Sequence, residues 1–193
     1  MGAIFQSLGR TVTAGVVLVV ILMVAVGSGV KYDHTWGAFI MRWFHVLSGI
    51  MWIGLLWYLN FVQIPSMPKI PDEQKPAISK VIAPAVLFWF RWAALATVVT
   101  GLLLAWMNGY FGNLFTFARP FTAIAIGMWL GLIMAFNVWF IIWPNQKKAL
   151  GIVQVDADAK AKAARMAMLT SRFNTMFSIP MLFCMVAQQN GGL

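Results

Sequence analysis

The chain has 193 residues, of which 61% are hydrophobic and only 10% are charged, and its formal net charge is +9. A soluble domain has about 25% charged residues, so this composition predicts an integral membrane protein. The basic residues flank apolar runs, where they set orientation and meet anionic lipid, and they do not indicate nucleic-acid binding. The single cysteine, Cys184, excludes an internal disulfide and a thiolate metal site, and His34 and His45 are too few for a multi-histidine metal centre.

The apolar runs predict an all-α, polytopic bundle of five transmembrane helices that form a single membrane domain over residues 1–193. A spanning helix needs about 20 mainly apolar residues, and proline removes a backbone donor, so proline clusters mark the predicted helix ends. The predicted spans are about residues 11–30, 37–63, 82–107, 120–143 and 170–188, with longer loops at 64–81 and 145–169. A helix rich in Ala and Lys is expected before the fifth span and could run directly into it.

The distribution of Lys and Arg predicts the orientation of these spans. The N-terminus and the 64–81 and 145–169 loops share one side and contain most of the basic residues. Because basic loops stay on the cytoplasmic side, we expect the N-terminus and both of these loops in the cytoplasm and the C-terminus outside.

The predicted second helix, residues 37–63, contains the only histidine inside an apolar run, His45. At 100° per residue, Gln63 shares the azimuth of His45, and Arg42 and Asn60 lie about 60° away. Lipid does not tolerate such a polar stripe, so it should face other helices or a bound group. His45 is therefore a candidate haem ligand, a candidate proton-relay or substrate-binding group, or a residue that only hydrogen-bonds a neighbouring helix.

The predicted orientation brings polar side chains from four helices to one inner layer, which has two arginines and no carboxylate. Such a layer could bind an anion: a propionate, a phosphate head group or an acidic small molecule. The alternative is structural, because Arg near a helix end often extends to lipid phosphate and Asn often hydrogen-bonds another helix. The candidate anion-binding residues are Asn60, Arg91, Asn137, Arg172 and Asn174. No residue is assigned as catalytic, and no metal site is predicted.

Four motifs resemble, in order, the N-terminal membrane domain of bacterial urate oxidases, also called urate hydroxylases. They are Arg-Trp-Phe-His-Val at 42–46 with Trp-Ile-Gly at 52–54, Phe-Trp-Phe-Arg-Trp at 88–92 with Thr-Gly at 100–101, the Asn-Val-Trp segment at 137–147, and Ser-Arg-Phe-Asn at 171–174 with the segment 179–183. The resemblance covers about residues 37–187. It implies a multi-pass protein of the bacterial inner membrane.

The chain departs from this family at positions where members have intramembrane histidines. Ala125 and Phe173 occupy two of these positions, and the exit of the last helix reads Gln188-Gln189-Asn190, so His45 alone remains. Full-length members also have additional helices and often a c-type cytochrome tail, and we find neither in this sequence.

Three functions fit these observations, and whether the chain is an enzyme stays open. The first is an accessory, non-catalytic subunit of a larger membrane oxidoreductase, packed against other membrane subunits or further copies of itself. The second is electron transfer by haem b bound through His45, with the inner arginines holding the propionates. The third is oxidation of urate or a related purine, which we place last because no second redox ligand is present. A transporter is not favoured, since the five spans show no inverted repeat.

Overall fold

The computed structural model describes residues 2–191, and the regular secondary structure of these residues is entirely helical. The chain divides into two compact units, residues 1–37 and 38–193. The first unit contains α1 (Gly2–Phe5) and α2 (Leu8–Val26). No residue of α2 is buried, and the hydroxyl groups of Thr11 and Thr13 donate to backbone carbonyls of the preceding turn. A helix that is apolar on every side and satisfies its own polar groups is suited to lipid.

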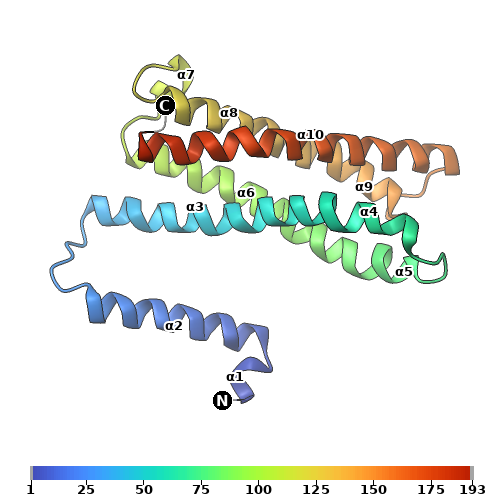
Figure 1. Cartoon of the computed structure of the whole chain (residues 1–193), viewed down its shortest axis with the longest axis horizontal. Helices are drawn as coiled ribbons and strands as arrows, with labels where there is room; N and C mark the ends of the chain where they lie inside the picture. The colour runs from blue at the N-terminus through green and yellow to red at the C-terminus, as the bar shows by residue number, and fades with distance from the viewer. Residues whose placement is uncertain (1, 192–193) are drawn as a thin grey trace. The chain divides into compact units, whose positions relative to one another are not determined.

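The second unit is an antiparallel bundle of long helical segments (Figure 1). Several helical elements follow each other without a break, so the bundle consists of four long helical segments. The short helix α7 (Asn113–Thr116) lies in the connection between the second and third of these segments. In Figure 1, α8 lies beside the C-terminal half of α10. The long segments are α3 (His34–Trp57) with η1 (Tyr58–Gln63), α4 (Ile64–Ser66) and η2 (Met67–Lys69); α5 (Lys75–Ala77) with η3 (Ile78–Ile82) and α6 (Ala83–Met107); α8 (Thr122–Phe136) with η4 (Asn137–Ile142) and α9 (Trp143–Ala149); and α10 (Ala157–Asn190).

Three of these segments extend past the bounds that the sequence predicts. The second helix continues beyond Gln63 to Lys69, the fourth continues beyond Trp143 to Ala149, and the third begins at Lys75 instead of about residue 82. The cause lies in η1, η3 and η4, which are π-helical turns that each end two residues before a proline. Proline lacks an N–H group and its ring clashes with the carbonyl of residue i−4, and the wider turn accommodates both effects. Proline therefore changes the hydrogen-bond register here without ending the helix.

Among the described residues 2–191, four helices are long and apolar enough to cross a membrane: Leu8–Val26, His34–Lys69, Lys75–Met107 and Thr122–Ala149. They overlap the first four predicted spans. The predicted fifth span lies within α10, which is one continuous helix from the Ala- and Lys-rich stretch onward. Asp156 caps the N-terminus of α10, because its carboxylate accepts a hydrogen bond from the Ala159 N–H at 2.7 Å.

The core of the second unit lies where α3, α6, α8 and α10 meet. Its largest fully buried side chains include Trp52, Leu56, Phe90 and Met134. Close contact between α8 and α10 depends on Gly127, because a Cβ there would approach the Cβ of Cys184 to 3.0 Å. This tight packing fixes the walls of the cavity described next.

Candidate functional site

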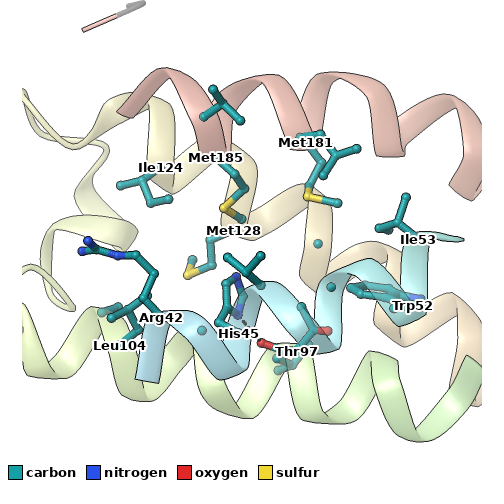
Figure 2. Close-up of a pocket in the computed structure, with 18 of the residues that line it drawn as sticks. Arg42, His45, Trp52, Ile53, Thr97, Leu104, Ile124, Met128, Met181 and Met185 are labelled. Atoms are coloured by element: carbon teal, nitrogen blue, oxygen red, sulfur yellow. Dashed lines mark hydrogen bonds between the residues drawn. The ribbon is translucent and has the colours of Figure 1, made fainter. Parts of the chain in front are cut away.

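A cavity of about 590 Å³ opens between α3, α6, α8 and α10 (Figure 2). This volume is within the range of sites that hold a cofactor or a drug-sized ligand, about 300–1,000 Å³. Most of the lining is aliphatic, aromatic or thioether. Its polar side chains are Arg42 and His45 on α3, Thr97 on α6, Tyr110, and Gln189 and Asn190 on α10.

His45 is held by α6 through one ring nitrogen. Its Nδ1 lies 2.9 Å from the carbonyl oxygen of Thr97 and 3.2 Å from Oγ1 of Thr100. A carbonyl oxygen can only accept, so Nδ1 carries the proton and Nε2 is left with its lone pair. Among the residues that the structure describes, no protein group hydrogen-bonds to Nε2. A histidine fixed in this way through Nδ1–H has the orientation and tautomer typical of a metal-ligating imidazole.

Gly101 makes room for this imidazole. A Cβ at position 101 would lie 2.8 Å from Cε1 and 3.2 Å from Nδ1 of His45, closer than ordinary van der Waals contact. Gly54 and Gly131 also line the cavity, and a Cβ at either one would meet no heavy atom within 4 Å. The absence of a side chain at Gly101 therefore leaves space for the His45 ring, whereas Gly54 and Gly131 border open space in the cavity.

The wall across from His45 is rich in sulfur. Figure 2 shows Met128 of α8 and Met185 of α10 directed toward the space above the imidazole, with Met181 farther along α10. Trp52 forms part of the wall, and its indole Nε1 is buried without a hydrogen-bond partner. Thioethers are soft and polarisable, so this wall suits an apolar ligand or a soft metal ion.

Arg42 and Tyr110 supply the charge and the phenol of the cavity. Nε of Arg42 is buried and has no hydrogen-bond partner among residues 2–191. Burial raises the pKa of Tyr110, and the positive charge of Arg42 opposes this shift only in part. The phenol therefore stays neutral near pH 7 and can donate a hydrogen bond. Arg42 was not among the predicted site residues, although its position three residues before His45 on one helix face is a signal for it.

The three predicted asparagines are buried, and their side chains form hydrogen bonds between α10 and neighbouring helices. Nδ2 of Asn137 donates to Oδ1 of Asn174 at 2.8 Å, and Nδ2 of Asn174 donates to the carbonyl of Met134 at 2.9 Å. Nδ2 of Asn60 donates to Oγ of Ser171 at 2.8 Å. These hydrogen bonds join α8 and η1 to α10. This is the structural role that the sequence left open for the asparagines as the alternative to anion binding. They also divide the predicted stripe of the second helix, because Asn60 contacts α10 whereas His45 contacts α6.

The two predicted arginines do not join the asparagines. The guanidinium carbon of Arg91 lies 3.4 Å from the centroid of the Trp143 ring, and Arg172 is exposed on α10. No hydrogen bond links either arginine to the buried amides. The structure therefore groups Asn137 with Asn174 and leaves both arginines apart from them.

Comparison with known proteins supports part of the predicted resemblance. The family model described as urate oxidase N-terminal matches residues 103–191. This segment is urate oxidase N-terminal-like. It contains the third and fourth motifs and supplies the α8 and α10 walls of the cavity. The first two motifs, with His45 and Arg91, lie outside the matched residues, and their resemblance stays a prediction. No curated protein and no solved structure matches the chain.

Proposed function

We propose that this chain binds a b-type haem in the cavity and relays electrons as a subunit of a membrane oxidoreductase. One observation carries the proposal: His45, fixed through Nδ1, leaves Nε2 without a protein partner in a 590 Å³ apolar cavity. A single imidazole does not hold a bare metal ion, so a metal here needs further ligands such as the four nitrogens of a porphyrin.

The residues that line the cavity fit this group. Nε2 of His45 would ligate the haem iron, and the thioether sulfurs of Met128 and Met185 are candidates for a second protein ligand. Arg42 would pair with a propionate carboxylate, since its buried Nε has no other partner. This role was expected for Arg91 and Arg172, but Arg42 is the arginine that lines the cavity of His45. When bound, the haem would supply a one-electron carrier.

The proposal includes five spans in a bacterial inner membrane, with the N-terminus in the cytoplasm. Packing supports the fifth span: α10 lies along α8, which is apolar enough to cross, so α10 should cross beside it. An odd number of crossings puts the termini on opposite sides, and the basic residues of the 64–81 and 145–169 segments favour the cytoplasmic side for both.

We also propose that the chain works within a larger assembly, with other membrane subunits or further copies of itself. A single haem can only pass an electron that it has received, so a donor and an acceptor outside this cavity are needed. Exposed aromatic side chains such as Phe140 and Trp106, each more than 60% exposed, offer apolar surface for such packing as well as for lipid.

The optical spectrum of the purified protein tests the haem proposal. Protein produced in haem-sufficient cells should show a Soret band, and His45→Ala should lose it. His34→Ala is the matched control, because it removes the same residue type outside the cavity and should leave the band unchanged. Wild-type protein without a Soret band, or an unaltered band in His45→Ala, would contradict the proposal.

The family match favours a second candidate, the binding of urate or a related purine in the same cavity. Arg42, Tyr110 and the terminal amides of Gln189 and Asn190 offer donors and acceptors for a planar anion. Titration of haem-free protein with urate tests this candidate. Binding that is lost in Arg42→Gln would support it, and no binding to the wild-type protein would refute it.

A further inference from the structure

Two cations share one aromatic ring at the end of the second unit that lies away from the His45 cavity. The ring belongs to Trp143, the first residue of α9, within the third motif. Figure 1 shows α9 near α4, whereas α7 and the C-terminus lie at the other end of the bundle. The proposed haem site uses none of these residues, so their arrangement needs a separate explanation.

Arg91 and Lys147 are the two cations. The guanidinium carbon of Arg91 lies 3.4 Å from the ring centroid of Trp143, and Nζ of Lys147 lies 5.6 Å from it. The two charges are thus at most about 9 Å apart, since these two distances to a shared point set the limit. Among residues 2–191, no carboxylate lies within ion-pair distance of either one. The cluster therefore has two like charges near each other and no protein anion beside them.

Arg91 also has an unused donor. No N–H group of its guanidinium has a hydrogen-bond partner in the part of the chain that the structure describes; Nη1 is buried, and the side chain as a whole is partly exposed. Stacking on Trp143 holds the guanidinium plane in place but uses none of its N–H groups. An oriented guanidinium with free donors and a second cation nearby matches a phosphate group, which has several acceptor oxygens and accepts paired hydrogen bonds from Arg.

The surroundings indicate where that phosphate comes from. Next to Arg91 on α6 are Phe88 and Trp92, and Phe140 precedes Trp143 on η4; all three side chains are exposed. Exposed aromatic residues beside a cationic site suit acyl chains and the interface between lipid and water. A soluble phosphate compound would gain nothing from these apolar contacts, whereas a phospholipid would bury its tail against them.

We propose that Arg91, Trp143 and Lys147 form a binding site for the phosphate head group of an anionic phospholipid. Arg91 donates paired hydrogen bonds to the phosphate, and Lys147 adds charge. Trp143 fixes the guanidinium plane at the level of the head groups. The site is independent of haem and would persist if the His45 cavity proved to bind something else.

Native mass spectrometry of the full chain, titrated with phosphatidylglycerol in detergent, tests the site. We expect wild-type protein to retain one tightly bound lipid, and Arg91→Gln or Lys147→Gln to weaken this binding about tenfold, equivalent to about 1.4 kcal/mol. Lys148→Gln is the matched control: it removes an adjacent but exposed lysine and should bind as wild type. Arg91→Lys keeps the charge and the fold, and should retain part of the affinity.

Three outcomes would overturn the assignment. Equal binding by Arg91→Gln, Lys147→Gln and Lys148→Gln would show that the cluster is not the site. Equal affinity for phosphatidylcholine would show that the net charge of the lipid does not matter. Displacement of the lipid by inorganic phosphate at matching concentration would assign the site to a soluble phosphate instead. A Soret band measured on the same variants separates these results from the haem proposal.

Discussion

Gly101→Ala tests whether the placement of His45 matters, without changing His45 itself. The added methyl group would lie 2.8 Å from Cε1 and 3.2 Å from Nδ1 of the imidazole. Carbon atoms in contact are usually about 3.5–4.0 Å apart, so the ring must shift by roughly 0.7 Å or more. Such a shift lengthens the 2.9 Å hydrogen bond from Nδ1 to the Thr97 carbonyl.

The magnitude follows from these two effects. Overpacking costs about 1–3 kcal/mol, and the weakened hydrogen bond adds about 0.5–1.5 kcal/mol. The methyl group displaces the ring in the haem-free protein, and the ring must return to its place to bind haem. The two costs together are about 1.5–4.5 kcal/mol, so haem affinity should fall by at least about tenfold, at about 1.4 kcal/mol for each factor of ten. Haem titration of the apoprotein, followed at the Soret band, measures this change.

Gly15→Ala is the matched control for this experiment. It adds the same methyl group to a helical glycine of α2 that does not line the cavity, and the new Cβ would meet no heavy atom within 4 Å. In a helix this change is neutral or slightly stabilising, because alanine loses less conformational freedom than glycine. Haem affinity of Gly101→Ala equal to that of wild type, or an equal loss in Gly15→Ala, would refute the role given to Gly101.

Three further predictions concern stability and are measured by unfolding in detergent. Asn174→Ala should destabilise the chain by about 2 kcal/mol or more, because it leaves the buried amide of Asn137 without its acceptor; no measurable loss would contradict this. A double-mutant cycle of Trp57→Phe and Ser178→Ala should give a coupling of about 1 kcal/mol for their 2.9 Å hydrogen bond, and zero coupling would count against that bond. Because burial raises the pKa of Tyr110, the folded chain holds the phenolic proton more tightly; stability should be full below about pH 10 and fall as the pH rises further, and Tyr110→Phe should flatten this fall.

The helical class and four apolar helices could be predicted from composition and run length, because a bilayer imposes both on the sequence. The third helix ends at Met107, as predicted, but the helix ends placed next to proline could not be predicted. From the local sequence, Pro65 and Pro144 are expected to end their helices. In the structure a π-helical turn precedes each proline, and the helix continues beyond it. A helix can end at proline or continue through a wider turn. Which of the two occurs depends on what the following residues pack against, and a single sequence does not show this packing.

The site was predicted in part, for a similar reason. Helical periodicity placed His45 on a polar face, but it could not say that this face meets Thr97 and Gly101, more than 50 residues later. Residue number placed Asn60 near Arg91 in depth, but it could not give their positions around the bundle axis. Depth follows from residue number at about 1.5 Å per residue, whereas the facing helix follows from tertiary packing alone.

The arrangement of the polar groups gives a physical reason for placing ligand binding at the His45 cavity rather than among the amides. Asn137 and Asn174 satisfy each other, so a ligand there would have to break a buried hydrogen bond to gain one. Nε2 of His45 and Nε of Arg42 have no protein partner, so a ligand that binds them breaks nothing. Unsatisfied groups beside open volume favour binding, and satisfied groups in a packed core favour stability. On this basis we expect the asparagines to stabilise the packing of α8, η4 and η1 against α10, and we expect the proposed ligand to bind the histidine and the arginine.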